Sequence, residues 1–185
     1  VMLGTALPIE PLQILWINMT TAVLLGLGLA FEPKEPGIMD RPPRAPGSSI
    51  VSRGALTRIV VSGLILLVCA FAVFEWAVAS GLGEAAARTA AVNVFMSVQI
   101  FYLFVCRSLR RSLFTYNPFG NPVILLGVAV VVVLQALFTY APFMNVAFGT
   151  VAISGGAWAV IIGIGVGAMV FMDLVGIVLR RLHIA

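Results

Sequence analysis

Three polar side chains that could bind a partner group or an ion, Asn18, Thr20 and Thr21, interrupt an apolar stretch near the start of this sequence. Asn18 and Thr21 are three residues apart, so a helix would place them on neighbouring positions of one face. Polar groups at the middle of a bilayer are costly, which makes them candidates for function. They can equally well hydrogen-bond a neighbouring helix or the carbonyls of their own helix. Spacing alone does not separate these two interpretations.

The stretch that carries them, residues 12–31, has no formal charge and the length of about 20 residues that a helix needs to cross a membrane. The whole chain is 61% hydrophobic and only 10% charged, which is typical of a polytopic membrane protein. We therefore predict an all-α transmembrane helix bundle. Its five complete spans are expected at residues 12–31, 55–80, 86–109, 122–140 and 151–179. Residues 1–6 are too short to span, so we expect them to be the end of a truncated transmembrane helix, followed by an external turn at residues 7–11.

Basic residues are distributed unevenly between the two sides of these spans. The side with the proline-rich loop at residues 32–54, the loop at 110–121 and the tail at 180–185 holds Lys34, Arg41, Arg44, Arg53, Arg58, Arg107, Arg110, Arg111, Arg180 and Arg181. The other side holds Arg88 alone. Because lysine and arginine accumulate in cytoplasmic loops, we predict a cytoplasmic C-terminus. Short loops and the lack of an organelle signal favour a multi-pass protein of a bacterial plasma membrane.

Small residues recur at every fourth position in the first and the last predicted spans. Such stripes allow a neighbouring helix to approach closely, so we predict that both serve helix packing. They consist of Ala22, Gly26 and Ala30 in the first span, and of Gly155, Ala159, Gly163 and Gly167 in the last.

Two motifs resemble P-type cation-transporting ATPases of the calcium-pump and sodium/potassium-pump branch. One is Trp16-Ile17-Asn18 with Thr21, which is similar to the ion-ligand run of the family's sixth transmembrane helix. The other matches the following cytoplasmic loop without a gap, as Ile38, Met39, Asp40, Arg41, Pro42, Pro43 and Arg44. Helix order and loop lengths extend the resemblance over nearly the whole chain, as helices six to ten of the family.

This resemblance implies the C-terminal membrane domain of an ATP-driven cation pump. Asn18, Thr21 and Gln99 would then supply cation-binding oxygens, and Ile38–Arg44 would form the coupling loop toward a phosphorylation domain. The sequence departs from calcium pumps at Ala22 and Gln99, where the family has carboxylates. We therefore expect a site with fewer acids; Ca²⁺ is one candidate for the transported cation, and its identity stays open.

The sequence has no constellation of residues for catalysis. It lacks a Cys/His cluster, a phosphate-binding Gly–Lys–Thr loop and the phosphorylation motif of the P-type family. We therefore predict no catalytic residue and no cofactor in this segment; the resemblance implies ATP and Mg²⁺ in the parent protein. The expected partners are the lipid bilayer, the transported cation, and the missing N-terminal helices and cytoplasmic domains of the same protein, and no nucleic acid.

Two other functions are compatible with the polar residues in the spans. One is a non-enzymatic membrane scaffold or accessory protein, in which these residues only link helices together. The other is a small secondary transporter, which should show paired broken helices in two corresponding halves. The sequence shows no internal repeat, which disfavours the transporter.

Overall fold

The computed structural model describes residues 7–34, 47, 51–107 and 120–182, and these form helices and connecting turns without a strand. In chain order the helices are α1 (Pro11–Thr20), the π-helix η1 (Thr21–Leu25), α2 (Gly26–Ala30), α3 (Arg53–Ala79), α4 (Glu84–Cys106), α5 (Pro122–Tyr140), α6 (Pro142–Phe148) and α7 (Gly155–Arg181). Five of the described segments are long and apolar enough to cross a membrane: Pro11–Ala30, α3, α4, α5 and α7. The all-α transmembrane bundle predicted from composition is therefore confirmed. The predicted helix end at residues 1–6 and the motif Ile38–Arg44 lie outside the described residues.

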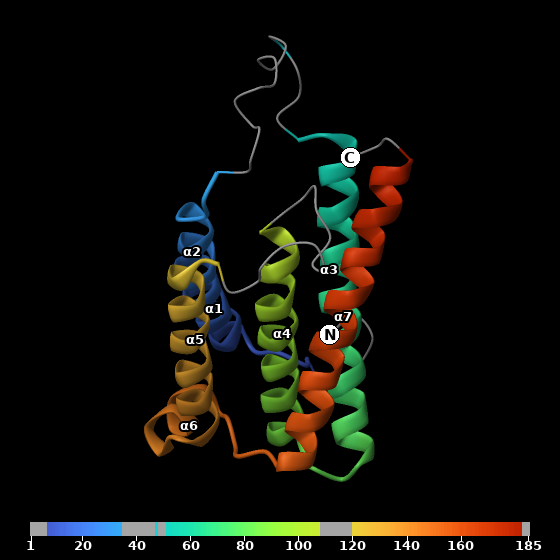
Figure 1. Cartoon of the computed structure of the whole chain (residues 1–185). Helices are drawn as coiled ribbons and strands as arrows, with labels where there is room; N and C mark the ends of the chain where they lie inside the picture. Colours follow the sequence, from blue (N-terminus) through green and yellow to red (C-terminus); the bar gives the residue numbers. More distant parts are fainter. Residues whose placement is uncertain (1–6, 35–46, 48–50, 108–119, 183–185) are drawn as a thin grey trace.

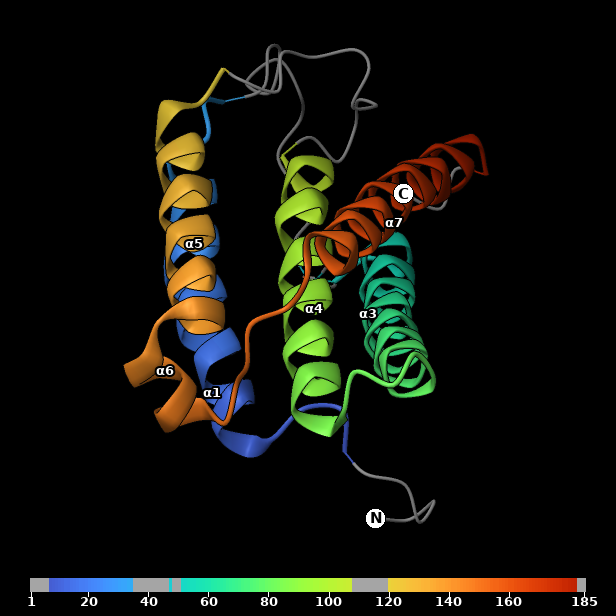
Figure 2. The ribbon, with the colours of Figure 1, turned by 90° about the horizontal axis from the view of Figure 1, so that it is seen from below.

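Helix α4 lies at the centre of the bundle (Figures 1 and 2). It packs mainly against α3 and α7 on one side, and α5 lies beside the continuous α1–η1–α2 segment on the other side. We call the end of the bundle at which α2, α4 and α7 terminate the basic end. The opposite end, with the turn at residues 80–83 and α6, is called the short-loop end (Figure 1). Leu7 lies near this end, where its carbonyl accepts from Arg88 in the second turn of α4.

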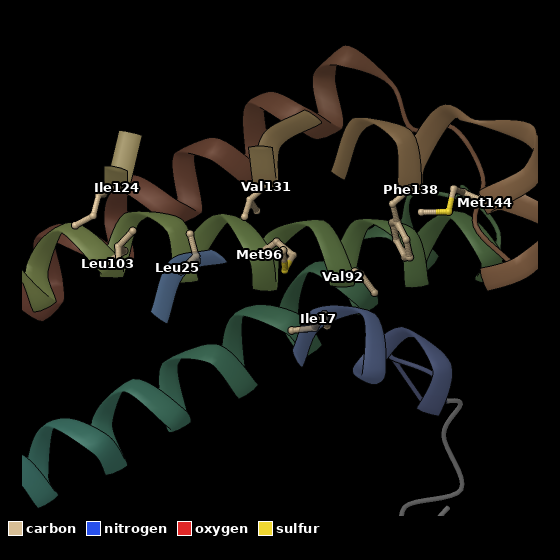
Figure 3. Close-up of a cluster of buried hydrophobic side chains, with 9 residues drawn as sticks. All are labelled: Ile17, Leu25, Val92, Met96, Leu103, Ile124, Val131, Phe138 and Met144. Atoms are coloured by element: carbon tan, nitrogen blue, oxygen red, sulfur yellow. The ribbon is translucent and has the colours of Figure 1, made fainter. Parts of the chain in front are cut away.

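The core between α4, α5 and the α1–η1–α2 segment is a continuous cluster of buried apolar side chains (Figure 3). The cluster consists of Ile17, Leu25, Val92, Met96, Leu103, Ile124, Val131, Phe138 and Met144. At the short-loop end the ring of Trp16 stacks on that of Phe138, with centroids 5.6 Å apart, and also contacts Phe148. The first predicted span is thus held through its Trp16–Ile17 side rather than through its small-residue stripe.

Helix starts follow from local sequence chemistry. Side-chain oxygens of Ser52, Asn121 and Ser154 accept hydrogen bonds from the first free backbone N–H groups of α3, α5 and α7. Helix α6 forms most of the connection between α5 and α7. Proline is well suited to the first turn of a helix, and Gly149 ends α6 in a left-handed conformation at φ 64°.

The two predicted small-residue stripes do not form the close helix contacts seen in the described residues. All seven of their members are exposed: Ala22, Gly26, Ala30, Gly155, Ala159, Gly163 and Gly167. The close approaches are made instead by Gly28, Gly127 and Gly165. An added Cβ would lie 3.2 Å from the side chain of Ile124 at Gly28 and 3.0 Å from the carbonyl oxygen of Leu24 at Gly127, and at Gly165 it would overlap Ser97 and Phe101. Packing of the predicted stripes against helices outside the described residues stays a prediction.

Candidate cation site and its supporting contacts

A groove of about 310 Å³ separates the α1–η1–α2 segment from α3 and α4. Most of its lining is apolar, but Thr21, Ser62, Gln99, Tyr102 and Cys106 contribute polar atoms from three different segments. Thr21 and Gln99, which the sequence identified from separate spans, are therefore brought to the same groove. This juxtaposition makes the groove the candidate cation site.

The threonine wall of the groove has an irregular backbone. The π-helix η1 begins at Thr21, and π-helical turns inside α-helices are frequent at functional sites. The Thr21 hydroxyl donates to the carbonyl of Ile17 at 2.8 Å. Because the hydroxyl acts as the donor there, the lone pairs of Oγ1 remain available to accept a hydrogen bond or to bind a cation.

Thr20, the neighbouring threonine, is buried on a different face. Its hydroxyl donates to the carbonyls of Trp16 at 2.8 Å and Ile17 at 3.1 Å. It does not line the groove. Its hydroxyl also contacts the sulfur of Met96 on α4 at 3.9 Å, so bonding within its own helix and to a neighbouring helix accounts for Thr20.

Gln99 is the second polar group of the groove. Its Oε1 atom is buried and finds no hydrogen-bond partner among the described residues. An unpaired buried acceptor costs about 1–3 kcal/mol, so such an atom requires an explanation. An amide oxygen without a protein donor is a suitable ligand for a hard cation.

Asn18 is placed differently from Thr21 and Gln99. It lies on the exposed face of α1 and does not line the groove. Ala22, one turn further along, is exposed as well, and it contributes to the edge of the groove. A shared site for Asn18 and Gln99 would therefore need groups from outside the described residues.

The described residues contain no group of three or more His, Cys, Asp or Glu side chains that could hold a metal ion. This agrees with the uncharged character of Thr21 and Gln99. A cation at this groove would need uncharged oxygens from this chain and negative charge from elsewhere, because uncompensated charge is very unfavourable inside a membrane.

A second set of polar residues in the spans, not identified as a network from the sequence, links α1, α4 and α5. The indole N–H of Trp16 donates to Gln135 Oε1 at 3.3 Å, and Gln135 Nε2 donates to Asn93 Oδ1 at 3.0 Å. Asn93 Nδ2 in turn donates to the hydroxyl of Thr139 at 3.1 Å. The side-chain amides of Asn93 and Gln135 are thus paired on both their oxygen and their nitrogen, in contrast to Gln99, and this network links helices.

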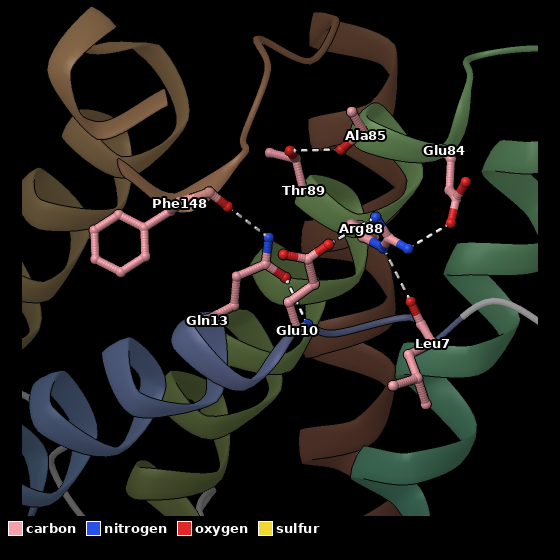
Figure 4. A network of polar contacts seen from close by, with 8 residues as sticks. All are labelled: Leu7, Glu10, Gln13, Glu84, Ala85, Arg88, Thr89 and Phe148. Carbon is pink, nitrogen blue, oxygen red and sulfur yellow. Dashed lines mark hydrogen bonds and ion pairs between the residues drawn. The ribbon is translucent and has the colours of Figure 1, made fainter. Parts of the chain in front are cut away.

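At the short-loop end, Arg88 fixes the turn that enters α1 (Figure 4). Its guanidinium pairs with Glu10 at 2.8 Å and with Glu84, and it donates to the carbonyl of Leu7 at 3.1 Å. Gln13 accepts from the backbone N–H of Glu10 and donates to the carbonyl of Phe148. Arg88, the single basic residue counted on this side of the predicted spans, therefore stabilises the turn.

At the basic end, Glu32, Arg107 and Asn121 form a cluster that we call the exit clamp. Arg107 Nε and Nη2 donate to the carboxylate of Glu32 at 3.0–3.2 Å, and Asn121 Nδ2 donates to it at 2.9 Å. Burial raises the pKa of the Glu32 carboxyl, but the hydrogen bonds from Arg107 and Asn121 and the charge of Arg107 outweigh it and leave the pKa below its ordinary value. Glu32 is therefore ionised at neutral pH.

Sequence reasoning also missed Asp173, a buried carboxylate in α7. It lies one turn before Gly176, beside which the guanidinium groups of Arg58 and Arg180 are found. The sequence could have indicated this residue, because an acidic side chain inside a long apolar run is rare and is usually paired with another polar or charged group.

Comparison with known proteins identifies the family of this chain. Residues 6–178 match the family described as "Cation transporting ATPase, C-terminus". The chain is 49% identical over 155 residues to the "Probable cation-transporting ATPase F" of Mycobacterium tuberculosis, covering 84% of this chain and 17% of that protein. It is 36% identical to the "Cation-transporting ATPase pma1" of Synechocystis sp., covering 86% of this chain and 18% of the relative.

A "Calcium-transporting ATPase" of Bacillus subtilis is 31% identical over 163 residues, which are 88% of this chain and 18% of the relative. The chain thus spans less than a fifth of the length of these relatives. The five apolar helices and the family together indicate that the chain is part of a multi-pass integral membrane protein in a lipid bilayer.

Proposed function

Because this chain belongs to the family of cation-transporting ATPase C-terminal domains, we propose that it forms part of the transmembrane cation pathway of an ATP-driven pump. In this proposal the basic end faces the cytoplasm, and the short-loop end faces the outside. ATP and Mg²⁺ act on parts of the protein beyond this chain. The segment Ile38–Arg44 couples the membrane helices to them.

One observation carries the proposal: Thr21 and Gln99 line the same groove, and Gln99 Oε1 has no partner among the described residues. Together with Asn18 they would supply neutral oxygens to the cation. Ca²⁺ is the first ion to test, since the Bacillus subtilis relative is named a calcium-transporting ATPase. With Ala22 and Gln99 uncharged, the site would hold one divalent ion per cycle or a smaller total charge.

Two neighbouring threonines provide a matched test in the full-length protein that contains this chain. Thr21→Val removes the groove hydroxyl and keeps the shape of the side chain. Thr20→Val removes a hydroxyl outside the groove, which donates to Trp16 and Ile17 of its own helix and contacts the sulfur of Met96 on α4. We expect Thr21→Val to raise the Ca²⁺ concentration for half-maximal ATPase activity about tenfold, which corresponds to about 1.4 kcal/mol of binding free energy. Thr20→Val should leave it within about twofold.

Asn18→Ala tests whether the site extends to the exposed face of α1, and a loss of cation activation is expected there as well. Wild-type cation activation in both Thr21→Val and Asn18→Ala would refute the proposed site.

A further inference from the structure

The exit clamp lies where the chain leaves the membrane. Glu32 follows α2, Arg107 follows α4, and Asn121 precedes α5, so all three residues stand just beyond the ends of membrane spans. Glu32 and Arg107 are 75 residues apart in the chain, and Glu32 and Asn121 are 89 apart. One carboxylate therefore joins three segments that are remote in sequence.

This cluster is enclosed rather than a surface ion pair. The side chain of Arg107 is 2% exposed and that of Glu32 is 22% exposed. Exposed pairs contribute little, whereas removing one partner of an enclosed pair leaves an uncompensated charge, which is strongly unfavourable. The two-pronged contact of Arg107 with Glu32 also fixes the direction of the carboxylate. The clamp therefore holds the end of α2 in one place.

The regular helix ends directly before Glu32, whose backbone N–H donates to the carbonyl of Leu29 at 3.1 Å. Helix α2 has only five residues, it follows the π-helical turn η1, and Pro33 cannot donate a backbone hydrogen bond to extend it. A displacement at η1 could then be absorbed by rotation of the backbone at the exit from the membrane. Packing of Gly28 against Ile124 already places α2 beside the start of α5, and the clamp extends this contact beyond the membrane.

We propose that Glu32 is a positioning residue for energy coupling: through Arg107 and Asn121 it makes the start of the proline-rich loop move together with α2, α4 and α5. A shift of η1 on cation binding is then delivered to the loop. This proposal rests on the proposed function, because it assumes a cation at the groove and a phosphorylation step elsewhere in the protein. Glu32 itself does not bind the cation.

The test uses the full-length protein and two separate measurements. Equilibrium ⁴⁵Ca²⁺ binding gives the amount of folded, cation-competent protein, and the initial rate of phosphoenzyme formation from ATP at saturating Ca²⁺ is divided by that amount. Glu32→Gln keeps the size of the side chain and removes its charge. We expect the phosphorylation rate per bound cation to fall about tenfold or more, as for other small misplacements far from the reacting atoms, with the Ca²⁺ affinity unchanged.

Two further variants sharpen the experiment. Asn121→Ser keeps a good helix cap for α5 but loses the amide donor to Glu32, so it should lower the normalised rate in the same direction. Glu10→Gln removes a carboxylate from the ion pair with Arg88 at the short-loop end, and it should leave the rate unchanged.

The double variant Glu32→Gln/Arg107→Gln should be no slower than Glu32→Gln, because residues that act as a unit are not additive. A merely structural role would lower cation binding and phosphorylation together and leave their ratio unchanged, and this outcome would overturn the proposal. An equal slowing by Glu10→Gln, or additive effects in the double variant, would overturn it too. Failure of the proposed function has a different signature, since Thr21→Val would then leave cation binding unchanged.

Discussion

Gln99 and Gln135, both in membrane spans, should respond in opposite directions to the same substitution. Gln99 Oε1 is buried without a partner among the described residues, whereas Gln135 accepts from Trp16 and donates to Asn93. Methionine has nearly the same length and no strong hydrogen-bonding group. Gln99→Met therefore removes an unsatisfied acceptor, and Gln135→Met creates unsatisfied groups on two neighbouring helices.

The magnitude follows from these contacts. An unpaired buried acceptor costs about 1–3 kcal/mol, so Gln99→Met should raise the free energy of unfolding by an amount of that order in cation-free buffer. Gln135→Met should lower it by about 1–2 kcal/mol, because hydrogen bonds between membrane helices are individually modest and two are lost here. Denaturant unfolding of the purified full-length protein in detergent with a chelator, followed by tryptophan fluorescence, measures both values.

Saturating Ca²⁺ adds a second comparison. A ligand at about 100 times its dissociation constant stabilises the wild-type protein by about 2.7 kcal/mol. Gln99→Met should lose much of this gain, and Gln135→Met should keep it. If Gln99→Met destabilises the cation-free protein as much as Gln135→Met, and keeps the full gain from Ca²⁺, the amide of Gln99 has a structural partner and the reasoning is wrong.

The remaining predictions concern packing and orientation. Gly165→Ala should destabilise the protein by about 1–3 kcal/mol relative to Gly163→Ala. An added methyl group overlaps two α4 side chains at position 165, whereas it meets open space at position 163. Equal unfolding midpoints of the two variants would refute this contact. In a background without native cysteines, a membrane-impermeant thiol reagent added from outside should label Leu82→Cys and spare Lys34→Cys, and the reverse pattern would refute the proposed orientation.

The arrangement into membrane-spanning helices could be predicted because it depends on properties that are local along the chain. Within a bilayer every backbone N–H and C=O must be paired inside the segment, so a long apolar run can only be a helix. Composition and the positions of proline therefore sufficed to predict five spans, and five helices of that character are found in the described residues. The motif around Trp16 likewise pointed to the family that residues 6–178 match.

The face of each helix that packs could not be read from the same patterns. Lipid and protein interiors are both apolar, so the sequence of a membrane helix does not distinguish its lipid-facing side from its packed side. The stripe at Gly163 and Gly167 looked like a packing seam, yet the close contact is made at Gly165. For the same reason Asn18 and Thr21, neighbours on a helical wheel, differ in the structure: only Thr21 lines the groove.

By itself the sequence determined whether each segment is a span, a turn or a basic loop. It also identified the polar residues whose burial in a membrane is energetically unfavourable. Only the tertiary structure decided which polar residues are satisfied. Gln99 and Gln135 are the same residue type in similar helices, but the side-chain oxygen of Gln99 has no hydrogen-bond partner among the described residues, whereas the amide of Gln135 has two partners. The pairing of Glu32 with Arg107, which are 75 residues apart in the chain, was likewise decided by the tertiary structure. Such partners meet through helix packing, and the free energy of a buried polar group depends on the atoms within about 3 Å of it, not on its neighbours along the chain.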